Sequence, residues 1–382
     1  MNHPAPPSAD LWIHLGDGRA DAGPVRSMLT RLAQEGDPLR VLITADRAED
    51  LPAVDDLPLR VATIVLPSDD PAALRDLPQR CGAAILLWCG GNFRVWLLEQ
   101  ARAAGLAVLA VNATGQIATR RRGLLSRRPV LAPALFYRIL ARDGAAAMQL
   151  RRAGIPADRI DVTGPMEEEA QPLPHDPNEL TVMAEAVNTR PVWHAAGVMP
   201  GEVAQMAEAH RAASRQGFRL LLLLTPRRAE DGQKAAAVLR KAGLRVGLRS
   251  NGDNPEEEIQ AYVTDIPGEI GLWYRLSPLS FMGGTFAGPE AMPPMQAAIL
   301  GSVVLNGPQT APFAEHYARL ETHGASRTVR SVQDLGLGLG TLIAPDRAAA
   351  MAEAGWQVLT RGAEVTNRMV DLLRDMLDRG RA

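Results

Sequence analysis

The sequence predicts an α/β protein made of two lobes that face a central cleft. Short apolar segments alternate with amphipathic or alanine-rich stretches along the chain, a rhythm typical of parallel α/β structure. One proline- and acid-rich segment, at 165–178, interrupts this rhythm before it restarts. With 382 residues, 46% of them hydrophobic, the chain is long enough to form two cores of ordinary size.

The first half begins with a polar, proline-rich terminus at 1–10, which we expect to be disordered. An N-terminal α/β lobe is expected over 11–164, followed by a linker at 165–180. The apolar segments of this lobe predict strands near 11–15, 39–44, 60–66, 83–88, 106–111, 138–142 and 160–163.

The second half, 181–360, repeats the pattern as a C-terminal α/β lobe. Its apolar segments predict strands near 191–195, 219–225, 245–249, 260–264, 279–282 and 303–306. Residues 345–379 are rich in alanine and charged side chains and predict one long helical stretch. Its last part, 361–382, we expect to form a C-terminal helix beyond the second lobe.

Composition argues against several classes of protein. A formal net charge of -2 gives no global attraction for nucleic acid, so we expect no nucleic-acid partner. The only cysteines, Cys81 and Cys89, match no metal motif and indicate a reducing compartment without a disulfide framework. The terminus lacks the regions of a signal peptide, and no run approaches the ~18 apolar residues of a membrane span. We therefore expect a cytoplasmic protein without a transmembrane anchor.

The most informative stretch is 262–308, which is centred on 280–285. An apolar strand there ends in the pair Gly283-Gly284, where bare backbone can approach a ligand and present N–H groups to an anion. A short helix precedes this turn, and a helical run and a strand follow it, which predicts a nucleotide site at the carboxyl edge of a parallel sheet. No His, Asp or Glu pair near the turn has metal-ligand spacing, so we expect no metal.

These residues also resemble a known family. The order D-I-P-G-E-I-G-L-W-Y from residue 265, F-M-G-G-T from 281 and G-P-Q-T from 307 is similar to the carboxyl-terminal domain of the Kdo transferases. That family moves 3-deoxy-D-manno-octulosonic acid (Kdo) from its CMP ester onto lipid A precursors, using two Rossmann-like lobes of the GT-B type. The resemblance implies a CMP-sugar donor substrate, no cofactor, an anionic glycolipid or glycan acceptor, and a C-terminal helix that crosses back to the first lobe.

The resemblance also implies which residues bind the donor. Arg227 lies in L-T-P-R-R, close to the family's L-[AV]-P-R-H, where a guanidinium can pair with a phosphate or carboxylate; the alternative is a surface arginine. Glu269 would contact the cytidine, or else be an acid favoured at a helix N-terminus. Gln296 replaces the glutamate expected to hold the ribose. The implied donor-binding set is Pro226, Arg227, Gly268, Glu269, Ile270, Gly283, Gly284, Thr285 and Gln296.

The family's catalytic motif is changed in this chain. Residues 12–14, Trp-Ile-His, resemble the opening of a motif whose terminal glutamate is the family's proposed general base, and that glutamate is absent. Asp17 is the candidate substitute, because a carboxylate on a glycine-flanked turn at the end of a strand can take a proton from a sugar hydroxyl. The alternative is an ordinary turn or helix-capping aspartate.

An arginine-rich segment follows in the first lobe, with Arg120, Arg121, Arg122, Arg127 and Arg128. Arginines suit phosphates, and a basic segment with leucines suits an anionic membrane surface, so we expect acceptor binding or peripheral contact with the inner membrane face. A solvated loop is the equal alternative.

Three functions stay open at this point. They are a Kdo transferase with an altered acceptor, a transferase that uses another nucleotide sugar, and a catalytically silent binding or scaffold protein. The changed base region favours the last two, whereas the retained Arg227 and Gly283-Gly284 favour nucleotide binding.

Overall fold

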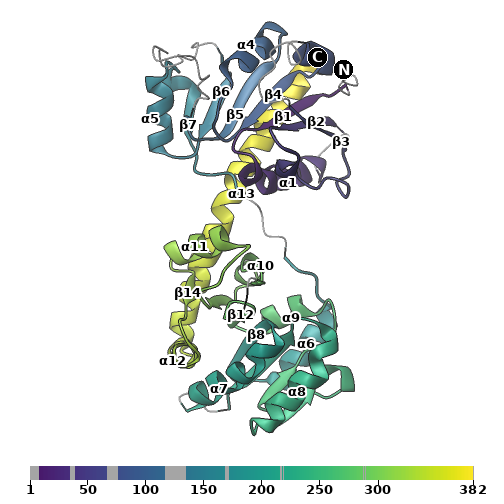
Figure 1. The fold of residues 1–382 in the computed structure, drawn as a ribbon, viewed down its shortest axis with the longest axis vertical. Helices are drawn as coiled ribbons and strands as arrows, with labels where there is room; N and C mark the ends of the chain where they lie inside the picture. The colour runs from purple at the N-terminus through teal and green to yellow at the C-terminus, as the bar shows by residue number, and fades with distance from the viewer. Residues whose placement is uncertain are drawn as a thin grey trace. The chain divides into compact units, whose positions relative to one another are not determined.

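A computed structural model of the chain describes residues 8–34, 39–66, 76–116, 135–167, 172–215, 217, 219–286, 288 and 290–381. The chain divides into two compact units, one formed by Met1–Glu169 with Arg361–Ala382 and the other by Ala170–Thr360. Each unit contains one seven-stranded sheet (Figure 1). Every strand pairing in both sheets is parallel, which confirms the predicted class of two parallel α/β lobes.

The sheet of the first unit has the strand order β3-β2-β1-β4-β5-β6-β7. Its strands are β1 (Leu11–Leu15), β2 (Arg40–Ala45), β3 (Arg60–Val65), β4 (Ile85–Cys89), β5 (Ala107–Ala113), β6 (Arg138–Ala141) and β7 (Ile160–Val162). Its helices are α1 (Arg19–Gln34), α3 (Leu77–Cys81), α4 (Val95–Ala103) and α5 (Gly144–Arg152). The order reverses between β1 and β4, so the ends of these two strands form the topological switch point of this sheet.

Helices cover both faces of the first sheet. Residues 11–15 and 85–89 are buried throughout, as expected for central strands of a parallel sheet. Alternate side chains of β1 point to opposite faces, so Trp12 packs with α3, α4 and α5, whereas Leu11 and Ile13 pack with α1. The second of these clusters also contains Met369 and Leu373, from the end of the chain.

The sheet of the second unit has the strand order β10-β11-β9-β8-β12-β13-β14. Its strands are β8 (Val192–Val198), β9 (Leu221–Pro226), β10 (Val246–Leu248), β11 (Ala261–Val263), β12 (Leu279–Met282), β13 (Val303–Asn306) and β14 (Ser326–Thr328). Its helices are α6 (Pro177–Val187), α7 (Val203–Ser214), α8 (Gly232–Lys241), α9 (Ile270–Leu276), α10 (Met295–Ile299), α11 (Ala314–Thr322) and α12 (Val332–Leu342). The order reverses between β8 and β12, which places the switch point of this sheet there.

The last helix, α13 (Pro345–Arg381), contributes to the cores of both units. Val358 and Leu359 lie in a cluster of the second unit with residues of β12, α10 and α11. Val365, Met369 and Leu373 belong to the first unit. The predicted long helical stretch is one continuous helix, and its residues from 361 onward belong to the first compact unit.

Every strand predicted from the sequence is present within the described residues. The prediction missed β14, whose three residues Ser-Arg-Thr carry no apolar side chain. The unit boundary at 169/170 lies inside the segment predicted as a linker, but α6 already begins at Pro177, before the predicted linker ends. The reason is local: Asp176 caps this helix by accepting hydrogen bonds from the N–H groups of Asn178 and Glu179.

Candidate functional site

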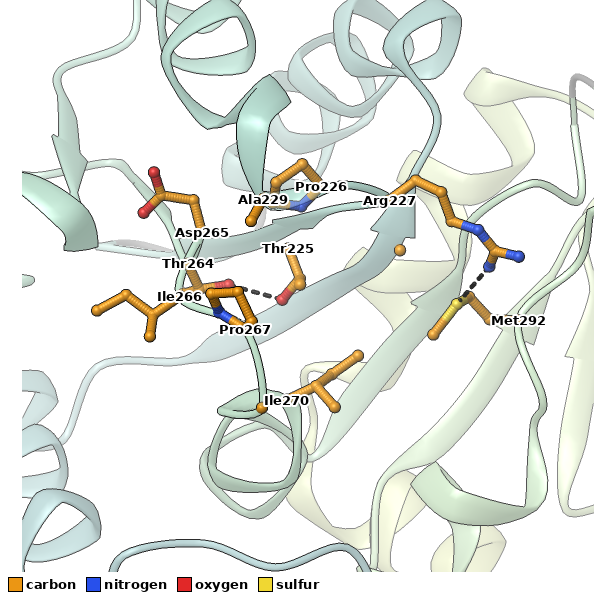
Figure 2. Close-up of a pocket in the computed structure, with 12 residues that line it drawn as sticks. Thr225, Pro226, Arg227, Ala229, Thr264, Asp265, Ile266, Pro267, Ile270 and Met292 are labelled. Atoms are coloured by element: carbon orange, nitrogen blue, oxygen red, sulfur yellow. Dashed lines mark hydrogen bonds between the residues drawn. The ribbon is translucent and has the colours of Figure 1, made fainter.

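A cavity of about 280 Å³ lies at the carboxyl ends of β8, β9 and β11 in the second unit (Figure 2). It adjoins the switch point of this sheet, the place where open α/β sheets bind their ligands. Four of the predicted donor residues, Pro226, Arg227, Gly268 and Ile270, line it. The other lining residues are Gly197, Thr225, Ala229, Thr264, Asp265, Ile266, Pro267 and Met292.

Arg227 follows β9 and extends along the edge of this cavity (Figure 2). Its backbone N–H donates to the carbonyl of Val198 (2.9 Å), which joins the ends of β8 and β9. Its guanidinium lies 2.7 Å from the Met292 Sδ and 3.9 Å from the carboxylate of Glu290, and the side chain is 30% exposed. A thioether is a weak acceptor and a long, exposed ion pair contributes little, so an anionic ligand can displace both partners.

The turn that follows β11 supplies another wall of the cavity. Asp265 anchors this turn, because its carboxylate accepts hydrogen bonds from the backbone N–H (2.9 Å) and the hydroxyl (2.7 Å) of Ser250. Gly268 has a φ of 86°, and among the described residues, its own chain neighbours apart, no atom lies within 4 Å of the position that a Cβ would occupy there. The backbone of this glycine is therefore open to a close approach by a ligand.

Glu269 is a predicted donor residue that does not line the cavity. Its two carboxylate oxygens accept hydrogen bonds from the guanidinium of Arg249, at 3.0 and 3.1 Å. Arg249 also donates to Glu179 (2.6 Å). The hydrogen bonds that Arg249 donates, to Glu269 above all and also to Glu179, raise the pKa of the guanidinium. Through Arg249, the carboxylate of Glu269 thus connects the start of α9 with α6 and with the segment after β10.

The paired-glycine turn after β12 does present N–H groups to an anion, but this anion is a side chain of the protein. The N–H of Gly284 donates to Oε2 of Glu202 (2.8 Å), and the N–H of Phe286 donates to its Oε1 (3.0 Å). Oε2 also accepts from the N–H of Met199 (3.1 Å). Glu202 is 0% exposed. The Gly284 N–H is thus already bonded inside the fold, and the contact of this turn with the donor phosphate stays a prediction.

The other predicted residues of this region also belong to the framework. The N–H of Gly283 donates to the carbonyl of Ala196 (2.8 Å). The buried hydroxyl of Thr285 donates to the Met282 carbonyl (2.6 Å) and accepts from a backbone N–H. Gln296 is half-buried in α10 and does not line the cavity. None of these residues lines the cavity, although the N–H of Met292, a partner of Arg227, donates to the carbonyl of Gly283 (3.2 Å).

A pair of hydroxyl groups in the cavity escaped the sequence analysis. Thr225 and Thr264 lie 2.6 Å apart between their Oγ1 atoms, and the dashed line in Figure 2 joins them. Behind them, Nε2 of His194 lies 2.7 Å from the Thr225 hydroxyl. Burial lowers the pKa of His194 to about 3, so this imidazole is neutral at physiological pH. Their positions in the sequence could have indicated them, because each threonine lies at the end of an apolar strand.

Asp17 lies in the first unit, on the turn between β1 and α1 and therefore at the switch point of that sheet. Its side chain is half-buried, and its Oδ1 accepts a hydrogen bond from the amide Nδ2 of Asn92 (3.3 Å). The same amide donates to the carbonyl of Gly16 (3.1 Å). The carboxylate of Asp17 is thus oriented by the turn that follows β4.

Comparison with known proteins identifies the family. The family model described as 3-deoxy-D-manno-octulosonic-acid transferase (kdotransferase) matches residues 3–168. The 3-deoxy-D-manno-octulosonic acid transferase of Bordetella pertussis is 31% identical over 398 aligned residues, which cover 98% of this chain and 89% of the relative. The chain belongs to the Kdo transferase family.

Two further matches complete this comparison. The Kdo transferase of Haemophilus influenzae is 27% identical over 248 residues, which span 63% of this chain and 57% of the relative's length. The crystal structure of the C-terminal CMP-Kdo binding domain of WaaA from Acinetobacter baumannii matches 48% of this chain and 96% of that one, with 22% identity and a TM-score of 0.44.

Three other expectations for this chain concern its arginine-rich segment, a metal site and a membrane span. The arginine-rich segment at 120–128 lies outside the described residues. Within the described ranges, no three His, Cys, Asp or Glu side chains are placed to hold a metal ion. No helix in the part of the chain that the structure describes has the length and apolar character needed to cross a membrane.

Proposed function

We propose that this member of the Kdo transferase family transfers Kdo or a related sugar from a CMP-activated donor to an anionic glycolipid or glycan acceptor. The observation that carries the proposal is the cavity in which Arg227, the open backbone of Gly268 and the hydroxyls of Thr225 and Thr264 meet. A guanidinium, an accessible backbone and hydroxyl groups are suitable hydrogen-bonding partners for a phosphate and a sugar acid.

The proposed chemistry divides between the two units. The acceptor hydroxyl oxygen forms a bond to the anomeric carbon of the sugar, while the bond from that carbon to the phosphate oxygen breaks and CMP leaves with the electron pair. The hydroxyl proton passes to a base, for which we propose the carboxylate of Asp17. We include no metal or other cofactor in this reaction.

A binding titration tests the donor site. CMP, UMP, GMP and AMP, and their nucleotide sugars, are titrated into the parent protein and into Arg227→Ala and Arg228→Ala. Arg228 is the matched control because it is the next residue and its side chain is 73% exposed. Cytidine-selective binding that is lost only in Arg227→Ala would support the proposal. Selectivity for another base would favour a different donor, and no nucleotide binding by the parent would overturn the site.

A transfer assay then separates a transferase from a catalytically silent binding protein. Asp17→Asn removes the proposed base, which typically costs ~100- to 10,000-fold in rate, without removing the donor cavity. If the parent binds CMP-Kdo but transfers no sugar to any glycolipid or glycan acceptor, the silent alternative holds. Transfer that is unaffected by Asp17→Asn would exclude Asp17 as the base.

We further propose that the arginine-rich segment binds the anionic acceptor or an anionic lipid surface. The support is composition, since five arginines occur within nine residues. Replacing all five by serine should abolish binding to vesicles that contain anionic lipid and leave nucleotide affinity unchanged. Equal vesicle binding by the parent and the variant would refute this part of the proposal.

A further inference from the structure

A second carboxyl group stands beside Asp17. Asp21 lies in the first turn of α1, and its Oδ2 accepts a hydrogen bond from the backbone N–H of Asp17 (2.9 Å). The Oδ2 atoms of both side chains lie 2.6 Å from the position that a Cβ on Gly90 would occupy. The two carboxyl groups therefore converge over the end of β4. Asp21 is 2% exposed, whereas Asp17 is half-buried.

The surroundings of Asp21 favour its neutral form. Burial is the largest influence and raises the pKa of Asp21 to about 7, and the charge of Asp17 raises it as well. The hydrogen bond from the Asp17 backbone, the side chain of Asn112 and the charge of Arg142 act in the opposite direction. The thiol of Cys89 is also near this acid, and burial raises the pKa of that thiol well above its usual value. No full positive charge is paired with Asp21 among the described residues.

A buried hydroxyl group also lies at this strand end. Oγ1 of Thr114, after β5, is buried and has no hydrogen-bond partner among the described residues. It lies 2.1 Å from the position that a Cβ on Gly91 would take, and Oδ1 of Asp17 lies 3.1 Å from that position. Gly90 and Gly91 thus leave room in which the hydroxyl and the Asp17 carboxylate approach each other.

We infer that Asp17 and Asp21 act as one carboxyl pair that holds a single proton at neutral pH, with Asp21 as the positioning residue of Asp17. Two carboxylates this close in a poorly solvated site cannot both ionise without a large cost. The buried partner, Asp21, keeps the proton. Asp21 also holds the turn through the Asp17 N–H and keeps a second negative charge away from an anionic acceptor. The catalytic meaning of the pair rests on the proposed function of Asp17.

Helix capping is the alternative role for Asp21, and it predicts the opposite dependence on pH. An ionised acid in the first turn of a helix is stabilising, so a capping Asp21 would make the fold more stable as it loses its proton. In the proposed pair, the folded-state pKa of about 7 lies above the ordinary value of 3.8. The contribution of Asp21 to stability is then complete below about pH 4 and is lost as the pH rises toward 7.

Stability against pH therefore decides between the two roles without any need for activity. The difference in folding stability between the parent and Asp21→Asn should change by about a thousandfold in the folding equilibrium constant between pH 4 and pH 8, in favour of the variant at high pH. Asp17→Asn should move the midpoint of this change to lower pH, because it removes the neighbouring charge. Asp50→Asn is the matched control, since Asp50 is also 2% exposed but pairs with Arg47. The parent's difference from this control variant should show no such change.

A second measurement uses the parent protein, so it can be made even if a variant fails to fold. Carboxyl ¹³C signals of aspartate-labelled parent protein should show one group that titrates near pH 7. A midpoint that Asp17→Asn leaves unchanged, or stability that rises as Asp21 ionises, would overturn the pair.

Transfer kinetics provide the functional readout. Asp21→Asn should change the pH profile of kcat/KM, because its amide oxygen still accepts the Asp17 N–H but its side chain cannot ionise. Asp21→Leu has no acceptor and should lose rate. An unaltered pH profile in Asp21→Asn would refute the positioning role. If the parent binds no nucleotide, the proposed function fails, while the titration of Asp21 still decides whether the pair exists.

Discussion

Replacing Glu202 by alanine should strongly destabilise the second unit. The carboxylate is 0% exposed and accepts three backbone N–H groups, those of Met199, Gly284 and Phe286, at 2.8–3.1 Å. Alanine leaves these buried donors without an acceptor, each at ~1–3 kcal/mol, while it also removes the cost of burying the charge. We expect a net loss of about 3–5 kcal/mol, which is a large share of the ~5–15 kcal/mol that stabilises a typical domain.

Glutamine is the more discriminating replacement at the same position. It keeps the volume, but its NH₂ group must face one of the backbone N–H donors, so we expect a loss of about 2–3 kcal/mol. The control is Glu208→Ala, because Glu208 lies in the following helix and is exposed; its effect should stay within about 0.5 kcal/mol.

Two measurements check this prediction. Urea denaturation gives the loss of stability, and amide hydrogen exchange reports directly on the N–H groups of Gly284 and Phe286, which should lose protection in both Glu202 variants. A loss below 1 kcal/mol with unchanged protection at these two amides would refute the assignment of the carboxylate to the glycine turn. The same result would reopen the turn as a phosphate site.

Three further predictions concern the second unit. Arg227→Ala should weaken nucleotide binding about 10- to 100-fold in a calorimetric titration, whereas Arg228→Ala should leave it unchanged. Gly268→Ala should cost about 1–2 kcal/mol of unfolding free energy because φ is 86°, and should weaken nucleotide binding by more than this strain accounts for if the ligand approaches the backbone there. Burial lowers the pKa values of His194 and His210 to about 3 and about 4. The contribution of these two neutral histidines to the stability of the unit is therefore complete above pH 6.5 and is lost as the pH falls toward their folded-state pKa values. Denaturation at pH 7.5 and pH 5 should differ by about 4 kcal/mol, and equal stabilities would contradict the prediction.

The strands of both units could be predicted because a parallel sheet buries both of its faces. Continuous apolar runs such as 221–224 and 85–88 therefore stand out from their neighbours in the sequence. Arg227 and Gly268 were implied by the family resemblance, and the structure places both in segments that follow strands and line the cavity. The short strand β14 gave no such signal.

The partners of the predicted residues could not be found in this way. Glu202 and Gly284 are 82 positions apart, and nothing local in either segment indicates that the carboxylate fills the glycine turn. The ion pair of Glu269 with Arg249 depends in the same way on how distant segments pack. The place of the cavity can therefore be predicted from the sequence. The groups that remain available to a ligand cannot, because they depend on which side chains are already hydrogen-bonded within the fold.

The continuity of α13 has a consequence for the order in which the protein is made. A ribosome that has synthesised residues 1–360 has produced every strand of the first unit and all of the second. It has not yet produced Val365, Met369, Val370 and Leu373, which complete the apolar cluster over β1 and α1. The first unit to emerge is thus the last that can close its core, and until then it exposes an apolar face to the chaperones that attend nascent chains.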